Sequence, residues 1–327
     1  MGRKVKVLVS THPFGKADPR SAEMIVAQGW ELEFNPYGRK ITQEELKVLL
    51  PEVDALIAGT ERLDADVLRN AGNLKLISRV GIGLDGIDWD EVQRRGIEVA
   101  YTPDAPTRSV AELTVGLMLD LARGISRTSR SMHEKEWHRY TGCELRGKTV
   151  GIIGFGRVGK SVASLLRSFE CRLLANDIRP DRERMRQLGV IEADKDEIYR
   201  TAQFVTLHVP LTDLTRHLIN ADALKRMRTD VCLINTSRGP VVDEQALFKA
   251  LSTGIIRSAA LDVYAEEPYA GPLTELENIV LTCHMGSCTE ESRAAMETEA
   301  AQAVIDFFLG RPLKNRVPDE LRIQTEG

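Results

Sequence analysis

The sequence predicts an α/β protein made of two doubly wound parallel-sheet domains. Strand-like and helix-like patterns alternate along the first hundred residues, a second alternating series begins at Lys148, and a glycine motif opens that second series. Alternation of strands with helices is typical of parallel sheets that are covered by helices on both faces. A chain of 327 residues is long enough for two such domains, each with its own core.

The first hundred residues contain the elements of a complete small α/β domain. Short apolar runs predict strands at residues 5–9, 31–34, 55–58, 74–78 and 97–100, and helical patterns lie between them at 21–28, 43–50, 65–70 and 89–95. The first predicted strand is followed by STHPFG at residues 10–15, which is not a glycine-rich phosphate loop. The first domain therefore carries no nucleotide motif of its own.

The second series predicts a larger sheet. Its six strands are expected at residues 149–153, 172–176, 204–208, 231–235, 258–262 and 279–282, a number that suits a dinucleotide-binding sheet. Long helical patterns at 109–123 and 290–309 frame this series. The simplest architecture returns the later helix to the first domain. We therefore expect a discontinuous substrate domain of residues 1–104 and 287–327, a nucleotide domain of residues 105–286, and a cleft between them.

Gly154, Gly156 and Gly159 have the G-x-G-x-x-G spacing directly after the predicted strand 149–153. The first glycine allows a tight turn, the second lets the backbone approach a pyrophosphate, and the third lets the next helix pack closely on the strand. That helix is expected at residues 157–169. This context predicts a dinucleotide site. A glycine-rich turn of another α/β unit, including an S-adenosylmethionine site, is the alternative.

Asp177 ends the following strand, where a carboxylate would bind the hydroxyl groups of the adenosine ribose. Because a carboxylate repels a ribose 2′-phosphate, Asp177 favours NAD over NADP. Arg179 and Arg182 follow closely and keep NADP open as an alternative.

Composition and charge exclude several other classes of protein. The net charge is −4 and the Lys and Arg residues are scattered, so no nucleic-acid partner is expected. No apolar run approaches the ~20 residues of a membrane helix, and the N-terminus lacks the features of a signal peptide. The five cysteines have no disulfide-framework spacing, which predicts a cytoplasmic protein. Cys283 and Cys288 flank His284, but further ligands are missing, so no metal site is expected.

Three reactive side chains follow successive strands of the second series, namely Arg238, Glu267 and His284. Ligands of open α/β sheets bind outside the carboxyl ends of the strands, so one edge could hold all three. A guanidinium binds a carboxylate bidentately, an imidazole gives or takes a proton near neutral pH, and a carboxylate beside the imidazole would fix its orientation. Taken singly, each residue also has an ordinary structural explanation, such as a surface charge or a loop residue.

Seven motifs occur in order along the chain. They are RVGIGLDGID at 79–88, RSVAELT at 108–114, GFGRVG at 154–159, LHVPLT at 207–212, NTSRGPVVD at 235–243, DVYAEEP at 262–268 and HMG at 284–286. Together they resemble the D-isomer-specific 2-hydroxyacid dehydrogenase family, in its phosphoglycerate-dehydrogenase-like branch, from the first predicted strand to about Pro318. The resemblance implies a flavodoxin-like substrate domain and a Rossmann domain that binds NAD.

The resemblance also implies hydride transfer between NAD and a 2-hydroxy or 2-oxo acid. His284 would be the general acid/base and Glu267 its partner, while Arg238 would bind the substrate carboxylate and polarise the C2 oxygen. The backbone amides of Val80 and Gly81 would hold the same carboxylate from the other domain, so domain closure would assemble the site.

For the cofactor, the resemblance implies contacts of Arg157 and Val158 with the pyrophosphate. Val209 and Thr236 would line the cofactor groove, and Asp262 would contact the nicotinamide amide. It also suggests a homodimer built through the long helix expected at 109–123 and its neighbourhood.

The chain departs from the family pattern in several places. The segment GTERLD at 59–64 lacks the arginine with which some phosphoglycerate dehydrogenases meet the phosphate. Arg62, Arg108 or Arg139 could serve instead, so a phosphorylated substrate stays open. Ser287 stands where the family usually has Gly or Ala, and it is small enough to be tolerated. The chain also stops where long phosphoglycerate dehydrogenases continue into a serine-sensing domain, so feedback control by that route is not expected.

Two other functions stay open. The same fold serves as an NAD-sensing corepressor, which can retain all three reactive residues but usually carries an extended disordered tail that this chain lacks. A dehydrogenase acting on formate or phosphite is the second. The formate branch has an amide in the place of Glu267, which argues against formate, whereas phosphite is harder to exclude.

Overall fold

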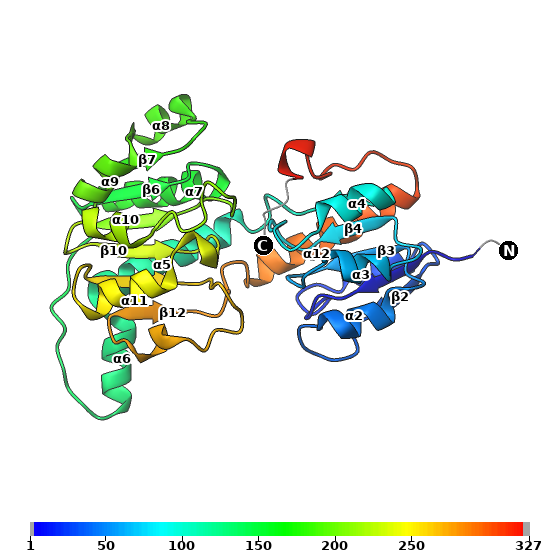
Figure 1. Cartoon of the computed structure of the whole chain (residues 1–327), viewed down its shortest axis with the longest axis horizontal. Coiled ribbons are helices and arrows are strands. Elements are labelled where there is room, and N and C mark those ends of the chain that lie inside the picture. Colours follow the sequence, from blue (N-terminus) through cyan, green and yellow to red (C-terminus); the bar gives the residue numbers. More distant parts are fainter. Residues whose placement is uncertain (1–2, 323–327) are drawn as a thin grey trace. The chain divides into compact units, whose positions relative to one another are not determined.

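A computed structural model describes residues 3–322, which form two compact units (Figure 1). Unit 1 contains the residues up to Pro106 together with those from Ser287 onward, and unit 2 contains Thr107–Gly286. The sequence places the two boundaries after residues 104 and 286. The ends of the expected substrate domain, residues 1–2 and 323–327, lie outside the described residues.

Unit 1 is built on five parallel strands in the order β2-β1-β3-β4-β5. The strands are β1 (Lys6–Val9), β2 (Glu31–Phe34), β3 (Ala55–Ala58), β4 (Leu76–Arg79) and β5 (Glu98–Ala100). The helices are α1 (Arg20–Val26), α2 (Gln43–Leu49), α3 (Ala65–Arg69), α4 (Trp89–Arg95) and α12 (Glu290–Phe308), with a short 3₁₀ turn η4 (Asp319–Leu321). Strands β3 and β4 are buried at every position, as expected for a parallel sheet covered on both faces.

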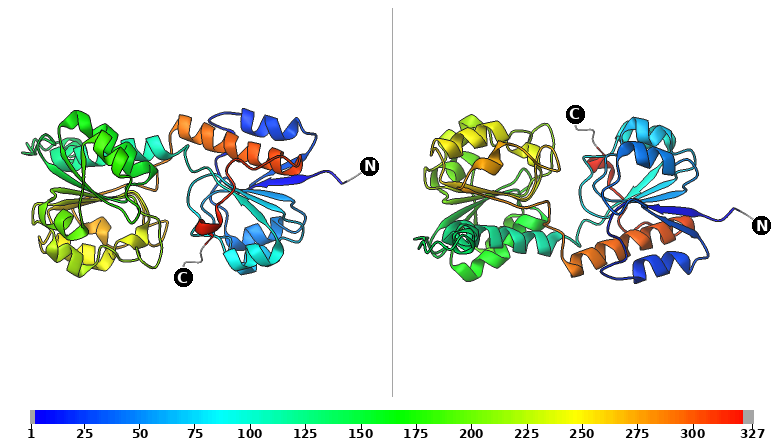
Figure 2. Two further views of the ribbon diagram at one scale, coloured as in Figure 1. Left: turned by 90° about the horizontal axis from the view of Figure 1, so that it is seen from above. Right: turned by 90° about the horizontal axis from the view of Figure 1, so that it is seen from below.

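Helices cover both faces of this sheet (Figure 2). Alternate residues of β3 point to opposite sides, so Ile57 packs with α1 and α12 while Leu56 packs with α2, α3 and α4. After unit 2 the chain returns to this sheet through α12. Glu297 of α12 is 1% exposed and accepts hydrogen bonds from Gly15 N–H at 2.8 Å and from Arg293 Nη2 at 2.7 Å. This contact fixes the loop that follows β1.

Unit 2 is built on seven parallel strands in the order β12-β11-β10-β9-β6-β7-β8. They are β6 (Thr149–Ile153), β7 (Arg172–Asn176), β8 (Val190–Glu192), β9 (Phe204–Leu207), β10 (Cys232–Asn235), β11 (Ser258–Leu261) and β12 (Ile279–Leu281). The expected count of six strands is wrong, because it omits β8. This edge strand has only three residues and no periodicity to reveal it. The strand order reverses between β9 and β6, which is where open α/β sheets bind their ligands.

The helices of unit 2 also lie on both faces of their sheet. They are α5 (Thr107–Arg123), α6 (Ile125–His133), α7 (Arg157–Leu166), α8 (Arg182–Leu188), α9 (Lys195–Thr201), α10 (Ala221–Arg226) and α11 (Glu244–Ser252), with 3₁₀ turns η1 (Arg167–Phe169), η2 (Gly239–Val241) and η3 (Pro272–Glu275). One core lies under α5 and α7, and the other under α9, α10 and α11. The doubly wound parallel architecture predicted for both domains is confirmed.

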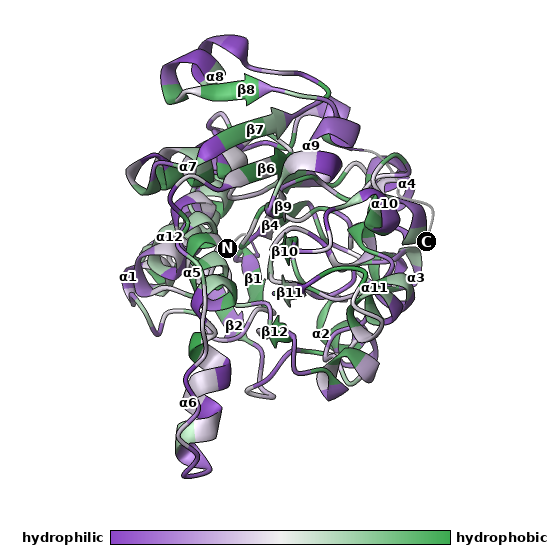
Figure 3. Ribbon diagram, turned by 90° about the vertical axis from the view of Figure 1, so that its left-hand side faces the viewer, coloured by the Kyte–Doolittle hydropathy of each residue, from purple (hydrophilic) through white to green (hydrophobic). Residues whose placement is uncertain are grey.

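Helix α6 differs from the other helices of unit 2. It has no buried residue, and the ribbon of unit 2 shows it standing away from the sheet and its covering helices (Figure 3). Its tertiary contacts are polar and exposed, such as the ion pair of Arg127 with Glu277 at 3.5 Å, and contacts of this kind stabilise a nine-residue helix only weakly. Helix α6 would therefore be more stable with a packing partner.

Candidate active site

The three reactive side chains follow three neighbouring strands of unit 2. Arg238 follows β10, Glu267 follows β11 and His284 follows β12, and these strands are adjacent in the sheet. They are parallel to one another, so their loops leave from the same edge. The structure thus places at one edge the residues that the sequence singles out.

His284 and Glu267 form the central contact at this edge. His284 Nδ1 lies 2.8 Å from Glu267 Oε2, and the side chains are 35% and 26% exposed. The second carboxylate oxygen, Oε1, accepts a hydrogen bond from Tyr264 N–H at 3.2 Å. The carboxylate therefore fixes the orientation of the ring and leaves Nε2 as the nitrogen that can meet a ligand.

Asp262 holds the turn that carries His284. The backbone of His284 is left-handed, with φ 52°, which is uncommon for a residue other than glycine. Asp262 Oδ1 accepts hydrogen bonds from Met285 N–H at 2.8 Å and from the Thr282 hydroxyl at 2.6 Å, and Oδ2 accepts one from Gly286 N–H at 2.8 Å. Asp262 is only 1% exposed. These contacts give it a structural task, while its contact with the nicotinamide stays a prediction.

The loop of Arg238 is fixed in the same way. Asn235, at the end of β10, donates from Nδ2 to the Arg238 carbonyl at 2.8 Å, and its Oδ1 accepts from the Ser237 N–H at 3.0 Å. A Cβ on Gly239 would lie 1.9 Å from the carbonyl carbon of Tyr264. Only glycine therefore lets this loop pack directly on the loop that follows β11.

The glycine motif has the close contacts that its spacing predicts. Gly154 has φ 95°, and a Cβ there would lie 2.3 Å from the carbonyl oxygen of His208. A Cβ on Gly159 would lie 2.1 Å from the Gly154 carbonyl oxygen, so helix α7 packs against the turn as closely as a backbone can. Gly156 is the N-cap residue of α7. A Cβ on Gly156 would meet nothing within 4 Å, so the backbone there is open, and the contact with a pyrophosphate stays a prediction.

Asp177 lies directly after β7, and the glycine turn orients its carboxylate. Oδ2 accepts a hydrogen bond from Phe155 N–H at 2.6 Å, and Oδ1 accepts one from Arg179 N–H at 2.8 Å. Each oxygen keeps acceptor capacity for a ribose hydroxyl. Arg182, which keeps NADP open in the sequence, forms two hydrogen bonds with Glu192 at 2.7 and 3.0 Å.

The remaining expected cofactor contacts surround the same strand ends. Arg157 and Val158 form the first turn of α7, and Val209 lies two residues after β9. Thr236 follows β10, and its hydroxyl lies 2.9 Å from that of Thr114 on α5. Their positions suit a cofactor groove, and the individual contacts stay predictions.

His208 is a site residue that the sequence reasoning did not single out. It directly follows β9, and its Nε2 lies 3.0 Å from the hydroxyl of Thr206. Burial lowers the pKa of His208 to about 3, so the ring is neutral at physiological pH. Its carbonyl contacts Gly154. His208 therefore supports the glycine turn without adding charge, and only its place within the motif at 207–212 hints at this in the sequence.

In unit 1, Val80 and Gly81 lie directly after β4, as expected for ligand-binding residues. Their own amides are already bonded: Val80 N–H donates to the Ala58 carbonyl at 2.8 Å, and Gly81 N–H donates to the Thr102 hydroxyl at 2.7 Å. The amide of Ile82, the next residue, has no hydrogen-bond partner within residues 3–322. The contact of Val80 and Gly81 with a substrate stays a prediction, and Ile82 is the amide with free capacity.

Glu61 is a second residue that the sequence reasoning did not single out. It is 4% exposed, and both of its carboxylate oxygens lie 2.9 Å from the N–H of Gly59, directly after β3. The hydroxyl of Ser10, directly after β1, donates to the same carboxylate. A fixed negative charge thus lies at the carboxyl edge of the unit 1 sheet. The long sequence separation of Ser10 and Glu61 hides the contact from any local pattern.

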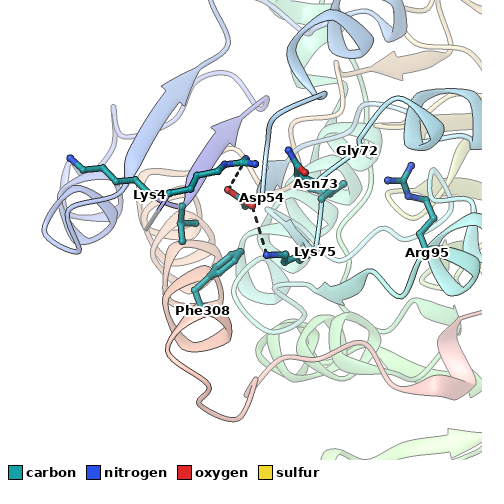
Figure 4. Close-up of a pocket in the computed structure, with 10 residues that line it drawn as sticks. Lys4, Asp54, Gly72, Asn73, Lys75, Arg95 and Phe308 are labelled. Carbon is teal, nitrogen blue, oxygen red and sulfur yellow. Dashed lines mark hydrogen bonds and ion pairs between the residues drawn. The ribbon is translucent and has the colours of Figure 1, made fainter. Parts of the chain in front are cut away.

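A cavity of about 460 Å³ lies at the opposite edge of the unit 1 sheet (Figure 4). Arg3, Asp54 and Lys75 line it and precede strands β1, β3 and β4. Three of its four cations are already used within the chain: Arg3 and Lys75 contact Asp54 at 3.2 and 3.9 Å, and Arg95 donates to two carbonyls near the end of α3. This cavity is therefore not the candidate site.

The described part of the chain offers neither a metal centre nor a membrane-spanning helix. Among residues 3–322 no group of three or more His, Cys, Asp or Glu side chains is placed to hold a metal ion. No helix within the same range has the length and apolar character needed to cross a membrane.

A family model matches residues 115–286, and it describes the NAD-binding domain of D-isomer specific 2-hydroxyacid dehydrogenases. The chain belongs to this family. Unit 2 contains the family's NAD-binding domain, and the expected cofactor, NAD, is confirmed. The resemblance drawn from the seven sequence motifs is confirmed as well.

Individual members of the dehydrogenase family are similar over most of this chain. The hydroxypyruvate reductase of Thermotoga maritima is 37% identical over 87% of the chain and 94% of its own length. The D-3-phosphoglycerate dehydrogenase of Methanocaldococcus jannaschii is 40% identical over 85% of the chain, which spans about half, 54%, of that protein. The crystal structure of the TT0316 protein from Thermus thermophilus has a TM-score of 0.86 and 32% identity, covering 96% of this chain and all of that one.

The depressed pKa of His208 predicts a pH dependence of stability. The ring ionises near pH 6.5 in the unfolded chain but only near pH 3 in the folded one, so acid favours unfolding. Between pH 7 and pH 5 this single group should lower the free energy of unfolding by about 2 kcal/mol. In urea titrations, the free energy of unfolding of His208→Gln should therefore fall less between pH 7 and pH 5 than that of the wild-type protein. His138→Gln, at an exposed imidazole, should keep the wild-type dependence; equal curves for all three proteins would contradict the assignment.

Proposed function

We propose that the protein is an NAD-dependent dehydrogenase that interconverts a D-2-hydroxy acid and its 2-oxo acid. The observation that carries this proposal is the 2.8 Å hydrogen bond between His284 Nδ1 and Glu267 Oε2. It lies at the carboxyl edge of the sheet that belongs to the NAD-binding domain. A corepressor can retain these residues, but an oriented proton donor at this edge is what reduction of a 2-oxo acid requires.

Each of the three side chains has one task in this proposal. His284 gives a proton from Nε2 to the C2 oxygen during reduction and takes it back during oxidation. Glu267 keeps Nδ1 occupied and stabilises the ring when it carries charge. Arg238 binds the substrate carboxylate and polarises the C2 carbonyl. When bound, NADH supplies the hydride from its nicotinamide ring.

The cofactor is held by the glycine turn and the strand ends beside it. Gly154, Gly156 and Gly159 let the pyrophosphate approach the first turn of α7, where Arg157 and Val158 lie. Asp177 accepts hydrogen bonds from the ribose hydroxyls. Val209, Thr236 and Asp262 complete the proposed set of cofactor contacts. The close backbone contacts at Gly154 and Gly159, and the open space beside Gly156, support this placement.

In unit 1, we assign part of the substrate contact to the turn after β4. Val80 and Gly81 place the amide of Ile82 at the carboxyl end of the strand, and this amide supplies a donor for a carboxylate. Thr102 holds the turn through its hydroxyl.

We further propose that the substrate carries no phosphate, as for glyoxylate or hydroxypyruvate. Glu61 places a buried carboxylate at the carboxyl edge of the unit 1 sheet. At an effective dielectric constant of ~20, two unit charges 4 Å apart interact by about 4 kcal/mol, so a phosphate brought to this edge would be repelled. Arg108, one alternative phosphate ligand, already pairs with Glu112 on α5.

A panel of 2-oxo acids tests this proposal. The protein should oxidise NADH when glyoxylate or hydroxypyruvate is added. Its kcat/KM for these two acids should be at least about 10-fold above that for 3-phosphohydroxypyruvate, a difference of ~1.4 kcal/mol in activation free energy. In Glu61→Gln the kcat/KM for 3-phosphohydroxypyruvate should rise by a similar factor relative to that for hydroxypyruvate. Glu52→Gln removes the same charge from an exposed position of unit 1 and should leave the ratio unchanged.

Two outcomes would contradict the proposal in different ways. Preference for 3-phosphohydroxypyruvate would overturn the substrate class while leaving the dehydrogenase intact. NADH binding without turnover of any 2-oxo acid would overturn the enzyme and support a corepressor-like or phosphite-type function.

We also propose that the protein is a homodimer formed through α6. The arm of residues 125–142, which comprises α6 and the segment after it, exposes large apolar side chains: Ile125 at 56%, Met132 at 50% and Trp137 at 75%. These apolar groups stay exposed although α6 contacts its own unit through the Arg127–Glu277 ion pair, and they therefore indicate an association surface. The arm continues directly from α5, the helix for which the sequence suggests dimerisation.

Sedimentation equilibrium tests the dimer. The wild-type protein should have about twice the 36.4 kDa mass of one chain, and Met132→Asp with Trp137→Asp should shift it to the monomer because both charges would be buried in the interface. Leu214→Asp, at an 81% exposed site outside the arm, should remain dimeric. A wild-type monomer, or a dimer that survives both arm substitutions, would overturn the assignment.

The cysteines support a cytoplasmic location, which we propose on that basis. All five are free thiols, and free thiols are typical of reducing compartments. A native protein isolated with an oxidised pair would contradict this location.

A further inference from the structure

Two cations near Asp177 are each held by a carboxylate of the chain. Arg182, the first residue of α8, donates from Nε and Nη2 to the two oxygens of Glu192 at 2.7 and 3.0 Å. Lys160 of α7 donates to Asp181 at 2.6 Å. Both cations are therefore already paired with carboxylates of the chain. A 2′-phosphate that bound near Asp177 would have to compete with these carboxylates for the cations.

The Arg182–Glu192 pair lies close to the proposed ribose site. Glu192 pairs with Ala175 in the register of β7 and β8, two residues before Asp177. One strand spacing of ~4.8 Å and two residues of ~3.3 Å each therefore separate the backbones of Glu192 and Asp177. Arg182, whose guanidinium pairs with Glu192 and which follows Asp177 by five residues, therefore lies near the proposed ribose site.

The geometry of the pair decides what Arg182 can bind. A guanidinium recognises a phosphate through the same pair of parallel N–H groups with which it recognises a carboxylate. In this structure Glu192 occupies that pair, and the hydrogen bond with Glu192 raises the pKa of Arg182. From the sequence alone, Arg182 is a candidate phosphate ligand. In the structure, its guanidinium is already paired with Glu192.

We propose that Glu192 is a cofactor-specificity residue, which keeps Arg182 in a bidentate ion pair and so withholds it from the 2′-phosphate of NADP. This inference rests on the proposed placement of the ribose at Asp177. Asp177 disfavours the phosphate directly, and Glu192 removes Arg182, one of the two cations, with Arg179, that could offset that repulsion. The selectivity for NAD then depends on a residue of the edge strand β8.

Direct binding measurements test the proposal without relying on turnover. NADH and NADPH are titrated separately into the full-length protein at low ionic strength, and binding is followed by nicotinamide fluorescence. In Glu192→Gln the Kd for NADPH should fall about fivefold or more, as expected for one new charge-assisted contact, while the Kd for NADH changes by less than about twofold. Glu183→Gln removes an equal charge from the exposed first turn of α8 without freeing a cation, and it should change neither Kd by more than about twofold.

The double variant Arg182→Gln with Glu192→Gln separates release of Arg182 from the loss of charge. It should lose the gain in NADPH affinity, because no guanidinium remains to be released. A gain that persists in the double variant, or an equal gain in Glu183→Gln, would overturn the specificity role of Glu192 alone. A wild-type protein that binds neither cofactor would overturn the proposed function and this inference with it.

Discussion

A single buried carboxylate holds the proposed catalytic edge in shape. Asp262 receives hydrogen bonds from the Thr282 hydroxyl and from the amides of Met285 and Gly286, and so closes the turn in which His284 has a left-handed backbone. Without these bonds nothing would offset the cost of that conformation. The position of the imidazole beside Glu267, and with it the proposed proton transfer, depends on this one constraint.

The two loops beside the His284 turn are fixed by equally local means. Asn235 ties the loop of Arg238 to the end of β10, and Gly239 lets that loop pack on the backbone of Tyr264. Tyr264 in turn donates its N–H to Glu267. Contacts within the chain therefore hold three loops from adjacent strands in position, and catalysis by positioning requires such pre-organisation. The sheet supplies the common edge, and short-range bonds supply the orientation.

Sequence patterns predict the parts of this site that are local. The spacing of Gly154, Gly156 and Gly159 follows from close backbone contacts within one βα unit, and strand-end positions identify His284 and its partners. Contacts between distant segments leave no such trace. Glu61 meets Ser10 across 51 residues, and Glu192 meets Arg182 from a three-residue edge strand. From the local sequence, Glu61 and Glu192 look like ordinary polar residues. Only the fold shows that they contact Ser10 and Arg182.

A double-mutant cycle on Asp262 and His284 tests the central claim most directly. If Asp262 acts by positioning the imidazole, Asp262→Asn should lower kcat by about 100-fold or more. The double variant with His284→Ala should then be no slower than His284→Ala alone, because both changes remove the same function. Losses that multiply in the double variant would contradict this account, because they would show that Asp262 acts independently of the imidazole.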